Sequence, residues 1–161
     1  SLFPDLLEKL IVVDIAPKYY APHHQEILAG LQALKAAEPA SRGEAESLLG
    51  KYVQEEGTKL FLLKNLYWKT KEKLALRINL EVLAEKVDAV GEALPHEYSF
   101  RKPALFIKGG NSSYIKDEDR GVIMTHFPSA RISVIPGAGH WVHAEKQKAF
   151  FEEVADFLAS K

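Results

Sequence analysis

Three short apolar runs, rich in valine and isoleucine, stand out along the chain. They cover residues 9–14, 104–107 and 131–135, and the last two are followed by Gly109-Gly110 and Pro136-Gly137. Nearly continuous runs of this kind, ending in turn-forming residues, are typical of strands covered on both faces in a parallel sheet. The chain is therefore predicted to contain three parallel strands.

Amphipathic segments follow the second and third of these strands. Residues 117–126 predict a short helix with acidic residues near its start, where the helix dipole favours negative charge. Residues 144–158 place apolar side chains at helical spacing and charged side chains on the opposite face. Strands and helices that alternate through short glycine- and proline-containing connections predict α/β architecture. We interpret this part as half of a doubly wound sheet.

The middle of the chain follows a different pattern, because its apolar residues recur at helical spacing. Residues 67–72 are charged and form either a loop or a small hairpin. A last helix begins at Asn79 and ends near Pro95. The other helices are expected over residues 24–37, 45–56 and 59–65, with Gly57-Thr58 as an interruption.

This contrast in pattern predicts two parts. The first is an α/β core made of residues 1–18 and 101–161, and the second is a helical cap of residues 19–100, inserted after the first strand.

Composition narrows the function classes. The 161 residues are 47% hydrophobic, which suffices for a domain with a core of its own. Lys and Arg number 21 against 22 Asp and Glu, so no basic field is available for nucleic acid. The absence of cysteine excludes a disulfide framework, a thiolate zinc site and a cysteine nucleophile. No apolar run is long enough to cross a bilayer. We expect a soluble protein without nucleic-acid or membrane partners, cytoplasmic or in the mitochondrial matrix.

A glycine-rich turn presents a histidine between the third strand and the last helix, in the segment Gly137-Ala138-Gly139-His140. Glycines allow the backbone conformations that lift an imidazole off a strand end toward a crevice. Because histidine titrates near neutrality, the residue suits a proton shuttle. A histidine that merely caps the turn is the alternative, but the strand–turn–helix context favours the shuttle.

Asp14 is the candidate partner of this histidine, because it ends the first strand at the sheet edge where open α/β folds keep their ligands. A carboxylate there can accept the Nδ1 hydrogen of His140 and fix its tautomer. A turn aspartate bonded to nearby backbone amides is an equally good interpretation of the local sequence. Although His140, His143 and Glu145 are neighbours, their spacing matches no helical zinc motif, and no metal is expected.

Three segments together resemble the α/β-hydrolase superfamily, in the order that the superfamily has them: residues 13–17, 105–114 and 137–146. The resemblance is closest to small bacterial carboxylesterases, acyl-CoA thioesterases and their mitochondrial abhydrolase-domain relatives. It implies that the chain is the carboxyl-terminal part of the fold, with a four-helix cap after its first strand. In this subgroup the triad acid follows that strand, which implies Asp14 as the acid, with Asp117 or Asp119 as the fallback.

The resemblance also identifies what the chain lacks. A serine hydrolase needs a Gly-x-Ser-x-Gly nucleophile elbow and an oxyanion hole, and the sequence contains neither motif. The resemblance implies that these parts come from an amino-terminal hydrolase half, or from a swapped copy of the chain. This chain alone is then expected to be inactive. Two alternatives remain: a noncatalytic ligand- or partner-binding remnant of a hydrolase, and an enzyme with an aspartate nucleophile, as in dehalogenases and epoxide hydrolases.

The implied reaction is hydrolysis of a small-molecule acyl ester or thioester, with no cofactor. Several side chains are candidates for contacting the substrate, two of them in the cap. Turn chemistry is the alternative for Asn111, and core packing is the alternative for Phe61 and Trp68 in the cap. The candidates are Asn111, Tyr114, Trp141, Phe61 and Trp68.

Overall fold

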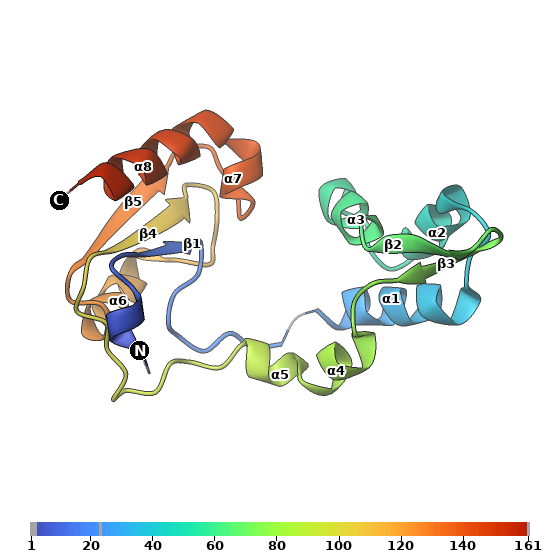
Figure 1. Cartoon of the computed structure of the whole chain (residues 1–161), viewed down its shortest axis with the longest axis horizontal. Helices are drawn as coiled ribbons and strands as arrows, with labels where there is room; N and C mark the ends of the chain where they lie inside the picture. The colour runs from blue at the N-terminus through green and yellow to red at the C-terminus, as the bar shows by residue number, and fades with distance from the viewer. Residues whose placement is uncertain (1–2, 23, 161) are drawn as a thin grey trace. The chain divides into compact units, whose positions relative to one another are not determined.

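The computed structural model describes residues 3–22 and 24–160, which fall into two compact units (Figure 1). The sheet unit consists of Ser1–Tyr19 and Ala93–Lys161, and the helical unit is Tyr20–Glu92. Within the described part of the chain, no helix is both long and apolar enough to cross a membrane.

The sheet unit contains the expected parallel sheet of three strands, in the order β1-β4-β5. A short 3-10 helix, η1 (Pro4–Leu6), precedes the first strand. The central strand is almost wholly buried, whereas the first strand is only half-buried, because it lies at an edge and pairs with one neighbour among the described residues. The expectation of cover on both faces thus holds best for the central strand. The strands are β1 (Leu10–Val13), β4 (Ala104–Gly109) and β5 (Ala130–Ile135).

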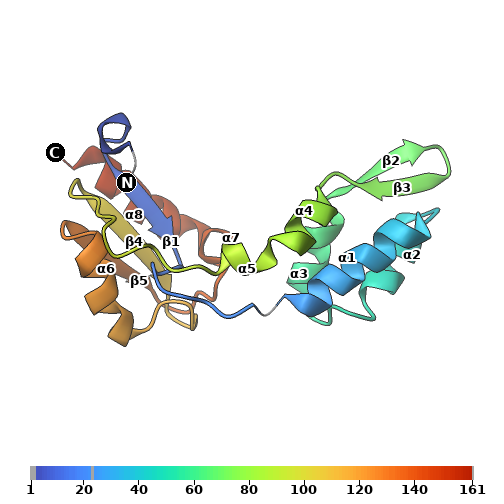
Figure 2. The ribbon, with the colours of Figure 1, turned by 90° about the horizontal axis from the view of Figure 1, so that it is seen from below.

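Helices cover both faces of this sheet (Figure 1, Figure 2). Alternate side chains of a strand point to opposite faces. On one face, Phe106 packs in a cluster with Ile123 and Phe127, at the end of α6 (Arg120–His126). On the other, Ile107 packs in a cluster with Phe157 of α8 (Gln147–Ala159). The α/β prediction is confirmed.

The helices of the sheet unit follow the predicted segments with one correction. The 3-10 turn η2 (Asp117–Asp119) and α6 together confirm the helix expected over residues 117–126. The single helix expected over residues 144–158 is wrong, because α7 (Val142–Glu145) and α8 are separated at Lys146, whose φ is −134°. The Glu145 carboxylate accepts hydrogen bonds from the amides of Gly139 and Trp141. These bonds hold α7 as a separate single turn.

The helical unit combines helices with a two-stranded antiparallel hairpin, so the hairpin is the correct one of the two alternatives for residues 67–72. Its core consists of apolar side chains from the helices and the hairpin, among them Leu34, Leu49 and Leu74. The elements are α1 (Gln25–Ala37), α2 (Arg42–Leu49), α3 (Glu56–Leu63), β2 (Leu66–Thr70), β3 (Lys73–Leu76), α4 (Leu80–Glu85) and α5 (Val87–Val90).

Helix boundaries in this unit differ from the prediction, and at the start of α3 a side-chain cap explains the difference. The helix expected over residues 45–56 ends at Leu49, and Gly57-Thr58 lies inside α3. The Glu55 carboxylate accepts hydrogen bonds from the amides of residues 57 and 58, at 2.8 and 2.5 Å, and so starts the helix ahead of the glycine. Asn79 caps α4 as expected, but the segment breaks at Lys86 before α5.

Candidate active site

The end of β1 presents a buried carboxylate. Asp14 is fully buried and has a φ of 50°, a left-handed conformation that Asp and Asn adopt more readily than most residues. Its amide donates to the Ile107 carbonyl at 2.8 Å, which extends the ladder of β4 by one bond. This conformation turns the side chain into the loops that follow the neighbouring strands.

Three donors satisfy the Asp14 carboxylate. Oδ1 accepts from the Gly109 amide at 3.0 Å. Oδ2 accepts from the Ser112 hydroxyl and lies 2.8 Å from Nδ1 of His140. A buried carboxylate is tolerated only when it is hydrogen-bonded in this way. The arrangement joins the ends of β1 and β4 to the loop after β5.

Close backbone contacts bring the histidine loop to this carboxylate. A Cβ on Gly109 would lie 2.1 Å from the Gly139 carbonyl oxygen, so only glycine allows the β4 end and the loop to approach this closely. Gly137, with a φ of +71°, turns the chain at the start of the loop. Asn111 takes part through its backbone, because its amide donates to the Ala138 carbonyl at 2.8 Å.

The imidazole of His140 contacts the buried Asp14 carboxylate through one nitrogen and is otherwise partly exposed. Its side chain is 43% exposed, whereas that of Asp14 is 0% exposed. With the Nδ1 hydrogen assigned to the bond with Asp14, Nε2 is the nitrogen left to accept a proton. An imidazole with one nitrogen held by a carboxylate and the other able to take up a proton has the arrangement of a general base.

Aromatic rings flank the imidazole on two sides. Tyr114 stacks on it with ring centroids 3.9 Å apart and an interplanar angle of 20°. Trp141 approaches edge-on, at 6.2 Å and 74°. Burial, together with the nearby Asp14 charge, raises the pKa of the Tyr114 phenol, so Tyr114 stays neutral beside the imidazole.

The candidate site residues predicted from the sequence therefore separate into two groups. Asp14, His140, Tyr114 and Trp141 come together at the carboxyl ends of the strands. Phe61 in α3 and Trp68 in β2 belong to the helical unit and are 45% and 50% exposed. Their contact with a substrate stays a prediction.

The fallback acids have other partners. Asp119 accepts hydrogen bonds from the Lys18 ammonium at 2.5 Å and from the Lys116 amide at 2.7 Å. Asp117 is exposed and lies 3.2 Å from the Lys108 ammonium. Within the described ranges, no three His, Cys, Asp or Glu side chains are grouped so that they could hold a metal ion.

Sequence reasoning left two supporting contacts unassigned. The position of Ser112 after the second predicted strand indicates pocket lining, a turn, or a residue that holds the His140 loop; in the structure its hydroxyl donates directly to Asp14. Glu145, weighed as a metal ligand, instead accepts the amides on both sides of His140 and so holds its loop, at 2.8 Å from Gly139 and 3.1 Å from Trp141. The sequence signal for the role of Glu145 is its position four residues after Trp141, on the first turn of a helix.

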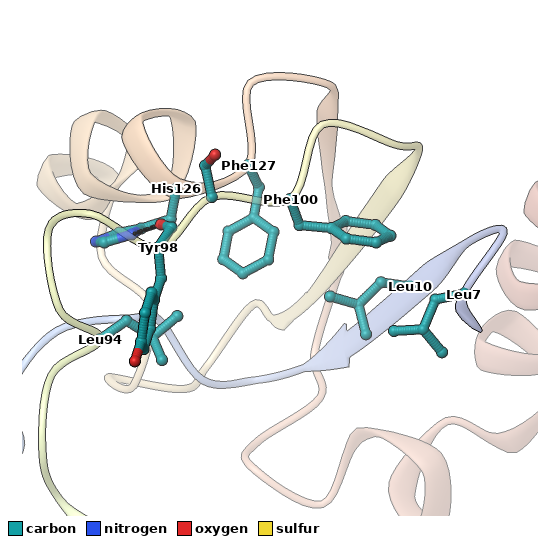
Figure 3. Close-up of a pocket in the computed structure, with 8 residues that line it drawn as sticks. Leu7, Leu10, Leu94, Tyr98, Phe100, His126 and Phe127 are labelled. Carbon is teal, nitrogen blue, oxygen red and sulfur yellow. Dashed lines mark hydrogen bonds between the residues drawn. The ribbon is translucent and has the colours of Figure 1, made fainter. Parts of the chain in front are cut away.

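A separate pocket of about 200 Å³ lies near the amino ends of the strands (Figure 3). It includes Leu10, the first residue of β1, together with Phe100 and Phe127, and shares no lining residue with the site around His140. The buried His126 lines it and holds the Tyr98 carbonyl oxygen at 2.7 Å through Nδ1. Because the strands are parallel, this pocket and His140 lie at opposite ends of the sheet.

The chain is similar to known proteins over nearly its whole length. It is 36% identical over 164 residues to Esterase YbfF of Escherichia coli strain K12, covering 98% of this chain and 60% of that protein. It is 35% identical over 162 residues to the mouse sn-1-specific diacylglycerol lipase ABHD11, covering 97% and 52%.

A solved structure gives the same result. A marine microorganism esterase is 35% identical to this chain, with a TM-score of 0.90, over 97% of this chain and 62% of that one. The chain thus spans between 52% and 62% of the length of the relatives that it matches. No protein-family model matches it.

Proposed function

The chain belongs to the α/β-hydrolase superfamily and is the carboxyl-terminal part of that fold; on this premise, we propose that it supplies the acid and the general base of a serine ester or thioester hydrolase. The observation that best supports this proposal is the 2.8 Å contact between a buried Asp14 carboxylate and a half-exposed His140 imidazole. The sequence holds no Gly-x-Ser-x-Gly elbow. We therefore assign the nucleophile and the oxyanion hole to an amino-terminal hydrolase segment.

The proposed reaction uses His140 twice. Nε2 takes the proton of the nucleophilic serine while the serine oxygen bonds to the acyl carbon. The imidazolium then gives this proton to the leaving alkoxide or thiolate as the carbon–oxygen or carbon–sulfur bond breaks. Water, deprotonated by the same nitrogen, then bonds to the acyl carbon and the bond from that carbon to the serine oxygen breaks. The imidazolium returns its proton to the serine oxygen, and the carboxylic acid leaves. Asp14 keeps its contact with Nδ1 throughout and stabilises the imidazolium.

Acyl esters or thioesters of small to medium chain length are the proposed substrates. The relatives named above are an esterase and a diacylglycerol lipase, which makes acylglycerols one class to test. Tyr114 and Trp141 give the site aromatic walls, which suit an apolar acyl group. Phe61 and Trp68 are proposed as further acyl contacts in the assembled protein.

The exposed edge of β1 is where we propose that the amino-terminal segment adds the next strand. Among the described residues, β1 pairs only with β4. Phe3 and Leu6, just before this strand, are 68% and 81% exposed. An unpaired edge beside apolar side chains favours association with another segment. A swapped copy of this chain is the alternative occupant, and the molar mass of the purified chain in solution distinguishes the two.

A fusion protein tests the proposed function. The part of Esterase YbfF that this chain does not match is joined to the amino end of this chain, and hydrolysis of p-nitrophenyl butyrate, an acyl-CoA and a diacylglycerol is measured. We expect turnover by the fusion, none by the 161-residue chain alone, and loss of turnover in His140→Ala. Robust hydrolysis by this chain alone, abolished by His140→Ala, would contradict the proposal. A folded fusion without any hydrolysis would favour a noncatalytic binding role.

A further inference from the structure

We propose that Ser112 and Tyr114 are positioning residues for His140, acting together to hold the Asp14 carboxylate and the imidazole ring in one fixed arrangement. We call these two residues the Ser112–Tyr114 clamp. The inference rests on the proposed function, because it takes His140 as the general base. It adds to that function two residues that touch neither the nucleophile nor the acyl carbon in the proposed reaction.

The first half of the clamp is a chain of hydrogen bonds. The Tyr114 amide donates to the Ser112 oxygen at 3.2 Å, and the Ser112 hydroxyl donates to Oδ2 of Asp14. A hydroxyl has one hydrogen to give. Because the backbone amide occupies a lone pair of this oxygen, the hydrogen is directed at the carboxylate and the hydroxyl is not free to rotate away.

This donor fixes the carboxylate against rotation. Oδ2 receives both Ser112 and His140, while Oδ1 receives the Gly109 amide from the end of β4. A carboxylate held at both oxygens presents Oδ2 to Nδ1 in one orientation only. Removal of the Ser112 hydroxyl leaves His140 as the sole partner of that oxygen among these contacts, so the carboxylate and the imidazole can then move as a pair.

The second half of the clamp is the stacked ring. Tyr114 follows Ser112 by two residues, and its ring lies nearly parallel to the imidazole of His140, at a centroid distance of 3.9 Å. Asp14 fixes the position of one ring nitrogen, and the stack fixes the plane of the ring. Together these two constraints determine the direction of Nε2, the atom that must face the nucleophile.

The contacts therefore form a closed circuit: Tyr114 amide, Ser112 hydroxyl, Asp14 carboxylate, His140 ring and back to the Tyr114 ring. Two further ionisable groups beside this loop lie on α7. Glu145 holds the amides of Gly139 and Trp141, and His143 contacts the Trp141 ring at 6.2 Å. Neither of these two groups takes part in the circuit.

Exchange of the His140 Nδ1 proton with water, measured by NMR on the 161-residue chain, tests the clamp without any need for turnover. We expect Ser112→Ala to speed this exchange roughly two- to tenfold, the range set by loss of one hydrogen bond. Ser112→Thr keeps a hydroxyl and should retain slow exchange. Ser113→Ala removes the exposed neighbouring hydroxyl and is the matched control, expected to leave the rate unchanged.

The ring provides an independent arm in case Ser112→Ala does not fold. Tyr114→Leu removes the stack and should speed exchange roughly two- to tenfold, whereas Tyr114→Phe keeps the ring and should not. In the active fusion, Ser112→Ala should lower kcat and leave KM unchanged, because it misplaces the base and removes no proposed substrate contact. Tyr114→Leu should lower kcat as well, but its KM is not used as a readout, because the Tyr114 ring is also a proposed wall of the acyl site.

Asp14→Asn separates failure of the clamp from failure of the proposed function. If Asp14→Asn speeds the exchange and the disruptive Ser112 and Tyr114 variants do not, the clamp is overturned and the acid–base pair stands. If Asp14→Asn has no effect either, the pair itself does not form and the proposed function falls with it. Faster exchange in Tyr114→Phe, equal to that in Tyr114→Leu, would also overturn the role of the stack.

Discussion

The two units of the molecule treat ionisable side chains in opposite ways. The sheet unit buries Asp14, Asp119 and His126, which are the buried polar or charged side chains of the described chain. The buried core cluster of the helical unit consists of apolar residues only. Its ion pairs lie toward the surface, as between Glu38 and the ammonium groups of Lys69 and Lys73.

This difference supports the proposal that the sheet unit carries the chemistry. Burial of a charge is costly unless hydrogen bonds offset it, so a buried carboxylate with three donors points to a role that apolar packing cannot fill. Exposed ion pairs contribute little and need no such role. We expect substitutions in the sheet unit to change the reaction and substitutions in the helical unit to change mainly stability.

The largest expected effect is on the reaction, from Asp14→Asn in the fusion. We expect kcat to fall about 10⁴-fold, because an amide neither fixes the imidazole tautomer nor stabilises the imidazolium. The fold should persist, since Asn also adopts the left-handed conformation seen at Asp14, with a φ of 50°. Steady-state kinetics with circular dichroism measures both. A loss below about tenfold would assign the acid role elsewhere.

Leu49→Ala is the matching test in the helical unit. Leu49 is fully buried, so its truncation should lower the free energy of unfolding by about 2–5 kcal/mol. Leu60→Ala, at a residue that is 48% exposed, is the control and should cost less than about 1 kcal/mol. Urea unfolding measures the difference.

The Leu49→Ala variant also tests whether the Asp14–His140 contact is independent of the core of the helical unit. The described hydrogen bonds of Asp14 and His140 all come from the sheet unit. The Nδ1 proton signal of His140 should therefore be unchanged in Leu49→Ala. A shifted or lost signal would contradict the contrast between the units.

Gly109→Ala tests the close approach that brings His140 to Asp14. The new Cβ would lie 2.1 Å from the Gly139 oxygen and 2.8 Å from the Ala138 oxygen, both of them backbone atoms. We expect destabilisation of about 1–3 kcal/mol and loss of the His140 Nδ1 proton signal. Gly121→Ala, where a Cβ meets no atom within 4 Å, should stabilise by up to about 1 kcal/mol. Equal effects of the two variants would mean that the loop has room at Gly109.

Glu38→Gln should have the smallest effect, and it should depend on pH. Hydrogen bonds from Lys69 and then Lys73 lower the pKa of Glu38 from 4.5 to about 2. A lowered pKa means that the contribution to stability is complete above pH 4.5 and disappears as the pH falls through about 2. At pH 7 the melting temperature of the variant should be slightly lower than that of the natural chain. This difference in melting temperature should disappear as the pH falls from 4.5 to 2.

Glu72→Gln, in the turn of the hairpin that carries Lys69 and Lys73, is the control for Glu38. Glu72 makes no ion pair in the described part of the chain, so its substitution should leave the melting temperature unchanged at every pH. A gap between Glu38→Gln and the natural chain that persists at pH 2 would mean that packing, and not charge, is lost at Glu38.

Much of the sheet unit could be predicted because its strands are continuous apolar runs in the sequence. Leu10–Val13 and Ala104–Gly109 are too apolar for any exposed element, and the turns after them place Asp14 and the histidine loop at one sheet edge. The family resemblance then favoured Asp14 over the later acids. The structure joins Asp14 to His140 by a hydrogen bond.

The remainder depended on side-chain contacts that hydrophobic spacing does not encode. Glu55 starts α3 before a glycine that the pattern took for a break, and Glu145 closes α7 where the pattern continued. Ser112 has several hydrogen-bond partners open to it in a turn, and only the folded chain selects the Asp14 carboxylate. Caps and second contacts of this kind are decided by tertiary structure.

Covalent labelling of the fusion with a fluorophosphonate, followed by peptide mapping, tests the central claim most directly. We predict one labelled serine, located outside the 161 residues of this chain, and labelling that slows at least a hundredfold in His140→Ala and Asp14→Asn. A label on a serine of this chain, such as Ser112, or a rate indifferent to His140 would contradict the assignment of acid and base to this chain and of nucleophile to another segment.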